Sequence, residues 1–173
     1  DMTLTNDVEW IFANSMVVSN GATLTIEPGT IIKMSENRRI IVDPNSRIFS
    51  NGTPEEPVVI QSAGNGYWRG VSIEGDILDF ENNSQTSLQD LKLHPLMSRA
   101  KFTYTNFIGW GLEGSEFGGA VQWYGNYFVG PGVYEDCNFQ EFNYGWACLC
   151  AGGIFDRCNL RYGTFVTKII RSN

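Results

Sequence analysis

Short apolar segments with alternating side chains dominate residues 17–75 and predict β-strands rather than helices. The segments are only three to five residues long, and Gly, Pro, Asn or Asp closes each one. Their apolar pairs are Leu24 and Ile26, Ile31 and Ile32, Ile40 and Val42, Val58 and Ile60, and Val71 and Ile73. Most connections lack the Gly positions that two-residue hairpins need. Parallel coils are the better arrangement, because each short strand pairs with the coil above, about 4.8 Å away, around one shared core.

One run of segments carries a resemblance to a known fold family. GATLTIEPGTIIKM is followed by an RIIV strand, a GTPEEPVVIQS turn and strand, and a WRGVSIEG strand. This order resembles the start of a right-handed parallel β-helix of the pectin-lyase-like kind, as found in bacterial secreted and cell-surface proteins. The resemblance covers residues 7–75 well and the later coils loosely. It implies an all-β solenoid, and coils of about 20 to 30 residues predict six or seven of them in this chain.

Both the start of the chain and a central stretch depart from the repeating pattern. In residues 1–16, Val8, Trp10, Phe12 and Met16 alternate and predict an edge strand that caps the core, which leaves residues 17–173 as one β-helix domain. Residues 76–99 are acidic, then polar, then rich in leucine. The spacing of these leucines allows one or two helical turns before Pro95. We expect an irregular excursion that packs its leucines on the outer wall.

A repeated frame in residues 100–165 supports the solenoid independently. Asn106, Asn138 and Asn159 each follow an aromatic residue, two further residues and a Thr or Cys, and the last two lie 21 residues apart, which is one coil. We expect these asparagines to adopt the left-handed conformation in a turn and to form a hydrogen-bonded ladder. Cys137 and Cys158 occupy the same place in successive repeats and should stack. Three roles are consistent with these two cysteines and with Cys148 and Cys150. They could be small apolar side chains inside the coils, form disulfides or bind zinc.

Charge and composition limit the classes of partner. The chain has 19 acidic and 12 basic residues, a net charge of −7 and no basic cluster beyond Arg38 and Arg39, so nucleic acid is not expected as a partner. No apolar run is long enough for a membrane span. The 19 glycines and the low charged fraction of 18% are typical of secreted or cell-surface β-proteins. The last strand stops at Asn173 without a polar cap, which favours a domain of a larger chain or assembly.

Two groups of residues are candidates for chemistry. Asp76, Asp79 and Glu81 offer oxygen ligands for calcium, with a solvated acidic loop as the alternative, and no other cofactor is expected. The resemblance to β-helix polysaccharide lyases implies a basic residue beside such a calcium, for which Arg69, Arg99 and Lys101 are candidates. His94 is the only histidine and is expected to be a half-covered loop residue, which disfavours Ser-His-Asp hydrolysis.

Aromatic residues make up 13% of the chain and concentrate in its second half. Several of them adjoin glycine, and a flat ring beside a bare backbone can serve as a platform for a sugar face. The candidate glycan platform consists of Trp110, Trp123, Tyr124, Tyr127 and Trp146. The alternative for each is that the glycine turns the coil while the ring packs in the core.

Together these features indicate a non-catalytic exported β-helix domain that acts as a scaffold or binds a polysaccharide or surface glycan through an aromatic-rich wall. Two other functions fit the same fold. One is a polysaccharide lyase or glycoside hydrolase, and the other is a structural adhesin or spacer module.

Overall fold

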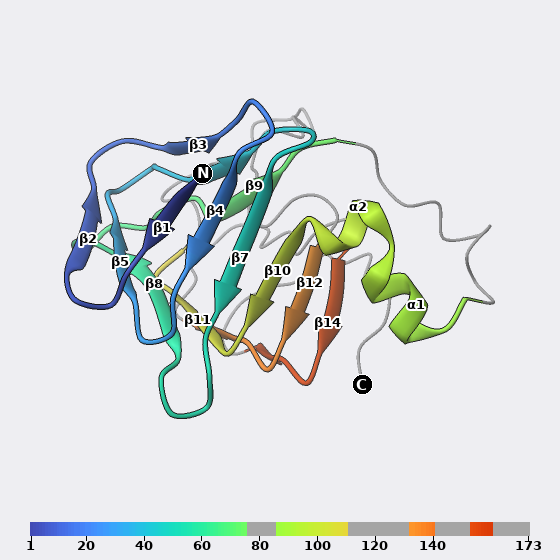
Figure 1. The fold of residues 1–173 in the computed structure, drawn as a ribbon. Helices are drawn as coiled ribbons and strands as arrows, with labels where there is room; N and C mark the ends of the chain where they lie inside the picture. The colour runs from blue at the N-terminus through green and yellow to red at the C-terminus, as the bar shows by residue number, and fades with distance from the viewer. Residues whose placement is uncertain (76–85, 111–131, 141–152, 161–173) are drawn as a thin grey trace, which may run out of the picture.

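The chain folds into a parallel β-helix, as the short alternating segments predict. A computed structural model describes residues 1–75, 86–110, 132–140 and 153–160, and within these ranges the strands form three parallel sheets, named here A, B and C (Figure 1). Sheet A contains β1 (Met2–Leu4), β4 (Thr23–Ile26), β7 (Arg47–Asn51), β10 (Ala100–Thr103), β12 (Gly132–Glu135) and β14 (Gly153–Asp156). Sheet B contains β2 (Glu9–Phe12), β5 (Ile31–Met34), β8 (Val58–Ser62), β11 (Thr105–Ile108), β13 (Asn138–Gln140) and β15 (Asn159–Leu160). Sheet C contains β3 (Met16–Val18), β6 (Ile40–Val42) and β9 (Val71–Ile73).

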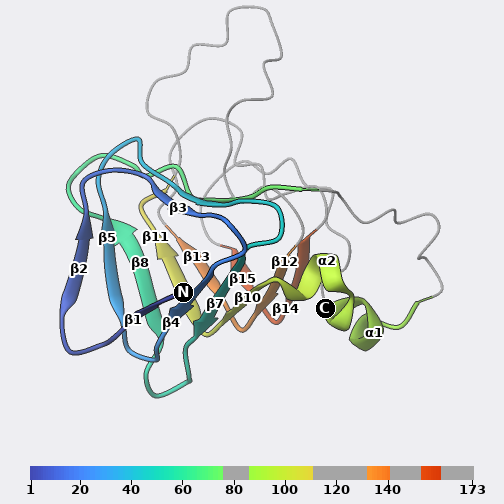
Figure 2. The ribbon, with the colours of Figure 1, turned by 45° about the horizontal axis from the view of Figure 1, so that its top comes forward.

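From β1 to β9 the chain visits the three sheets in turn, so that one circuit forms one coil of the solenoid (Figure 2). From β10 on, the described strands belong to sheets A and B. Each strand pairs in parallel with the strand of the next coil; for example, Leu24 of β4 lies opposite Ile48 of β7. Parallel pairing in register gives every residue a partner directly above it, and inward side chains therefore form columns along the axis.

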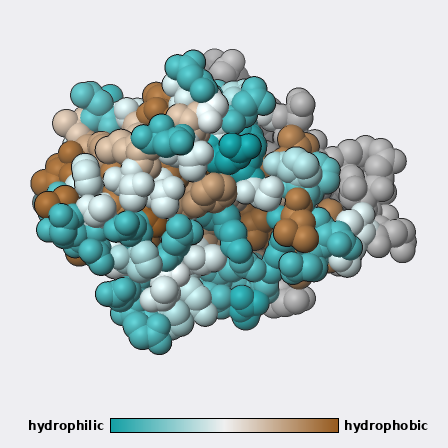
Figure 3. Space-filling model, viewed as in Figure 1, coloured by the Kyte–Doolittle hydropathy of each residue, from teal (hydrophilic) through white to brown (hydrophobic). Residues whose placement is uncertain are grey.

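Residues 1–16, expected to cap the core, instead supply most of the first coil. β1 pairs with β4, β2 with β5 and β3 with β6, all in parallel. Leu4 is fully buried and Trp10 packs against the core, whereas Val8 is exposed. The first coil forms because its few inward residues continue the columns of the second coil. Figure 3 shows apolar surface at this end of the molecule, where Ile11 is 65% exposed.

The core changes in character along the axis. The first three coils are filled mainly with aliphatic side chains such as Ile26, Ile32 and Ile60, and Trp68 adds one buried ring in the third coil. The later coils are filled with rings: Tyr134 stacks on Phe102 and on Phe155, with ring centroids 5.0 and 4.7 Å apart. Phe107 and Phe139 form a second stack with a spacing of 4.8 Å. These spacings equal the distance between paired strands, so the backbone ladder and the ring columns reinforce each other.

The turns between sheets A and B are short in the later coils and depend on a left-handed residue. Tyr104, Asp136 and Arg157 have φ of 41°, 53° and 52°, and each follows directly after a strand of sheet A. The left-handed position was expected at Asn106, Asn138 and Asn159, and that expectation is wrong. These asparagines lie two residues further on, within sheet B, because the chain turns from sheet A to sheet B before it reaches them.

Two short helices leave the solenoid between β9 and β10 and lie on the outer face of sheet A. α1 (Leu88–Leu93) begins at Ser87, whose side chain accepts a hydrogen bond from the Asp90 N–H, and α2 (Pro95–Ser98) follows after His94. Figure 1 shows both helices beside β12 and β14, at the end of the solenoid opposite β2. Leu91 and Met97 are buried against Val133 and Ile154 on the outward face of these strands. The leucines of the excursion therefore pack on the outer wall, as expected.

Candidate functional site

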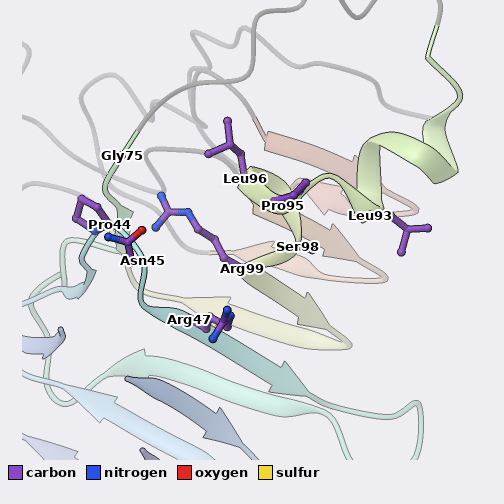
Figure 4. Close-up of a pocket in the computed structure, with 9 residues that line it drawn as sticks. All are labelled: Pro44, Asn45, Arg47, Gly75, Leu93, Pro95, Leu96, Ser98 and Arg99. Atoms are coloured by element: carbon purple, nitrogen blue, oxygen red, sulfur yellow. The ribbon is translucent and has the colours of Figure 1, made fainter. Parts of the chain in front are cut away.

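A groove opens where the helical excursion meets the wall of the solenoid, beside the turn from sheet C to sheet A. Its volume is about 550 Å³, which is within the usual range for small-ligand sites. The lining residues, shown in Figure 4, are Pro44, Asn45, Arg47, Gly75, Leu93, Pro95, Leu96, Ser98 and Arg99. Three segments that are distant in sequence thus meet at this groove because consecutive coils stack there.

Two arginines are placed side by side in the groove by the strand register. Ile48 pairs with Ala100, and the Ile48 N–H donates to the Arg99 carbonyl at 2.9 Å. Arg47 and Arg99 directly precede this pair and so lie on adjacent coils, roughly one strand spacing apart. Like charges in directly opposed positions destabilise a sheet. An anion bound between them would remove that penalty.

Arg99 is fixed in position, with only 8% of the residue exposed. Its guanidinium donates to the Asp43 carbonyl at 3.2 Å and to the Glu74 carbonyl. Gly75 permits this approach, because a Cβ at that position would lie 3.0 Å from Nη2 of Arg99, and its φ of +127° also favours glycine. Arg99 therefore supplies a buried positive charge whose orientation is set before any ligand arrives.

Arg47 is exposed and free to contact a ligand. In the described part of the chain, no carboxylate forms an ion pair with it. Figure 4 shows Arg47 on the strand next to Arg99, whose guanidinium is turned towards Asn45 and Gly75. The remaining lining combines the Asn45 amide and the Ser98 hydroxyl with apolar prolines and leucines. This combination suits a ligand with an anionic group, hydroxyls and a partly apolar face.

A cluster of charges holds the helical side of the groove against the wall. Lys92 of α1 donates to Glu135 at 2.6 Å and to Asp156 at 2.5 Å, and these two carboxylates lie in register on β12 and β14. Lys101 also contacts Glu135 at 2.9 Å, and Arg157 contacts Asp156 at 2.7 Å. The cluster thus alternates positive and negative side chains across the three coils that contain β10, β12 and β14.

The pKa values of this cluster are shifted in the directions that favour its charged forms. Burial by itself lowers the pKa of Lys92, but its hydrogen bonds to Asp156 and Glu135 outweigh burial, and the pKa is raised. Burial raises the pKa of Glu135, but the hydrogen bonds from Lys92 and Lys101 bring it below its usual value. The hydrogen bond from Lys92 lowers the pKa of Asp156 despite burial. All these groups stay charged near neutral pH.

Of the five aromatic residues predicted as a glycan platform, Trp110 is the one that lies within the described residues. Trp110 is fully buried and forms a parallel bridge with Trp68, so its assignment to a surface platform is wrong. Its ring lies edge-on to Phe139 as part of the aromatic core, at a centroid distance of 6.3 Å. Trp123, Tyr124, Tyr127 and Trp146 lie outside the described residues.

The repeated asparagines and cysteines occupy equivalent places on successive coils. Asn138 donates to Asn106 at 2.7 Å, and Asn159 donates to Asn138 at 2.9 Å, which forms a ladder of side-chain amides on the outward face of sheet B. Cys137 is buried in the core and Cys158 packs against it. Both are free thiols.

Asp76, Asp79 and Glu81, the candidate calcium ligands, lie outside the described residues. Within the ranges that the structure describes, no three His, Cys, Asp or Glu side chains form a metal-binding group.

Arg99, Lys101 and His94, which were considered for catalysis, have structural contacts of their own. Arg99 is held by carbonyls, and Lys101 is paired with Glu135. The Nδ1 of His94 accepts a hydrogen bond from the Leu96 N–H at 3.2 Å, and His94 thereby joins the two helices.

Sequence reasoning missed Arg47. The only signal was its position directly before a buried strand residue, as for Arg99.

Fold and groove together define a parallel β-helix with a ligand-sized, arginine-lined hollow on its outer wall. A family model described as a pectate-lyase like beta helix domain matches residues 1–92, and the chain belongs to this family. No curated protein and no solved structure matches the chain significantly. Among the described residues, no helix is long and apolar enough to cross a membrane.

Proposed function

We propose that this chain is a non-catalytic domain of an exported or cell-surface protein and that it binds an anionic polysaccharide in the groove beside α2. The observation that carries the proposal is the register of Arg47 and Arg99, which puts two guanidinium-bearing residues on adjacent coils at one groove. Arg47 has no carboxylate partner in the described part of the chain. Membership of a family whose domains are often extracellular supports the location.

A uronic acid residue has the chemistry that this groove would recognise. Its carboxylate matches the fork of the Arg47 guanidinium, and its hydroxyls match the Asn45 amide and the Ser98 hydroxyl. The C–H face of the sugar ring would lie against the apolar lining, such as Pro44 and Leu96. The aromatic platform of Trp123, Tyr124, Tyr127 and Trp146 remains a prediction and would extend the same binding surface.

The test compares polygalacturonate with its methyl-esterified form by titration calorimetry at low salt. We expect binding to the free acid, loss of binding on esterification, and weakening as salt is added, because the Arg47 contact is exposed to solvent. Arg47→Gln should weaken binding about tenfold or more, since a hydrogen bond to a charged group is worth roughly 1.5–3 kcal/mol. Arg38→Gln is the matched control, because Arg38 is also exposed but does not line the groove.

Three results would contradict the proposal. Equal affinity of the Arg47→Gln variant and the unmodified protein would show that the groove is not the binding site. Equal binding of the free acid and the ester would show that the protein does not recognise the anionic group. Formation of unsaturated sugar products with calcium present would show a lyase instead of a binding domain.

A further inference from the structure

Cys137 and Cys158 lie in identical two-residue turns on neighbouring coils. Each turn connects a strand of sheet A to a strand of sheet B, and the residues on either side are in register: Glu135 with Asp156, and Asn138 with Asn159. The Asn159 N–H donates to the Cys137 carbonyl at 2.9 Å. Because the turns are equal in length and are fixed at both ends, the two cysteines stack, with Cα atoms about 4.8 Å apart.

The side chains of the two cysteines point in the same direction along the axis. Sγ of Cys137 lies 3.4 Å from the Phe102 carbonyl, and Sγ of Cys158 lies 3.3 Å from the Tyr134 carbonyl. Each thiol thus points to the coil before its own, which places the Cys158 sulfur next to the coil that carries Cys137. A Cα separation of about 4.8 Å falls within the range of 4.4–6.8 Å that disulfides span.

The two thiols differ in access and in proton affinity. Cys137 is completely buried, whereas Cys158 is partly exposed. Burial raises the pKa of the Cys137 thiol, and its hydrogen bond to Cys158 raises it further. That same hydrogen bond lowers the pKa of Cys158, against the effect of burial. A partly exposed thiol with a lowered pKa beside a buried second thiol is the arrangement found in redox-active cysteine pairs.

We propose that Cys137 and Cys158 form a redox-active pair that reacts with low-molecular-weight disulfides and closes a disulfide between two coils. The Cys158 thiolate attacks one sulfur of the small disulfide, forms a mixed disulfide and releases one small thiol. Cys137 then loses its proton and attacks the Cys158 sulfur, which releases the second small thiol. The protein loses two electrons and two protons in all, and one small disulfide is reduced to two thiols.

The test uses the full chain with Cys148→Ser and Cys150→Ser, so that only the proposed pair can react. The protein is equilibrated in glutathione buffers of increasing oxidised fraction, quenched with acid, alkylated and analysed by mass spectrometry. We expect both thiols to disappear in one transition and the peptides of Cys137 and Cys158 to become linked. Closing this loop should raise the melting temperature by about 5 °C or more.

Kinetic and variant controls separate the roles of the two sulfurs. With limiting iodoacetamide on the folded, reduced protein, Cys158 should react at least about tenfold faster than Cys137. Cys137→Ser should stop the reaction at a mixed disulfide between Cys158 and glutathione. The proposal is overturned if both thiols stay reduced in fully oxidised buffer, if only disulfides between molecules form, or if Cys137 reacts first.

Discussion

Lys92→Met should detach the helical excursion from the wall and lower the free energy of unfolding. The neighbouring charged side chains determine the size of this loss. Lys92, Glu135 and Asp156 have side chains that are only 13%, 16% and 8% exposed, so solvent replaces the lost contacts poorly. Breaking a fully buried pair costs about 3–5 kcal/mol, and an exposed pair is worth about 0–1 kcal/mol. Lys101 and Arg157 remain beside the two carboxylates, so we expect a loss of about 2 kcal/mol. Methionine keeps the apolar stem, which limits the change to the charge.

Thermal unfolding followed by circular dichroism measures this loss at neutral pH. About 2 kcal/mol corresponds to a fall in melting temperature of roughly 4–8 °C for a chain of this size. Hydrogen exchange should show the largest increase in residues 86–99, because α1 loses its anchor there. Lys33→Met is the matched control: Lys33 forms a 2.7 Å ion pair with Glu9, but the two side chains are 30% and 41% exposed, so we expect a change below about 0.5 kcal/mol.

The pH dependence distinguishes the charge contact from simple packing. The pKa values of Glu135 and Asp156 are lowered in the folded protein, so their stabilisation is complete above about pH 5 and is lost as pH falls through the lower folded values. The pKa of Lys92 is raised, so its contribution is lost only as pH rises above about 10.4. The difference between Lys92→Met and the unmodified protein should therefore narrow towards pH 3. A constant difference from pH 7 to pH 3, or one below about 0.5 kcal/mol at pH 7, would refute the reasoning.

Two further substitutions test the stacking of the coils. Among the described residues, Asn138 takes part in two hydrogen bonds of the ladder and Asn159 in one. Asn138→Ala should therefore cost about 1–2 kcal/mol in urea unfolding, roughly twice the cost of Asn159→Ala, and equal costs would show that the ladder is not cumulative. Gly52→Ala would place a Cβ 2.4 Å from the Tyr104 carbonyl oxygen of the next coil and should cost about 2 kcal/mol in the same assay. Gly64→Ala is its control, because its Cβ would meet nothing within 4 Å, and similar losses for both would exclude the clash as the cause.

The strands of the first three coils were predictable because their apolar residues alternate at the two-residue period of a strand. Ile40 and Val42, or Val58 and Ile60, are buried while the residue between them is only partly covered, which is the pattern of one inward face. The asparagine repeat also predicted correctly which residues stack. It misplaced the left-handed residue, since Tyr104, Asp136 and Arg157 share no residue type that marks a turn.

The groove was not predictable, because it depends on register and not on local pattern. Arg47 and Arg99 are more than 50 residues apart, and only the pairing of Ile48 with Ala100 brings them together. Trp110 shows the opposite error. Its neighbouring glycines suggested an exposed ring, but the bridge to Trp68 draws it into the core of the coil. The anchoring by Lys92 was equally hidden, because its two partners belong to two later coils.

The ring columns provide an internal optical probe of the fold. Phe102, Tyr134 and Phe155 are almost parallel, with interplanar angles of 3° and 4°. Fixed aromatic packing produces near-ultraviolet circular dichroism, which disappears when packing is lost even though secondary structure persists. A slip of one residue between two coils would turn an inward ring outward. The near-ultraviolet signal of Tyr134 would therefore report misaligned coils that retain a normal far-ultraviolet spectrum.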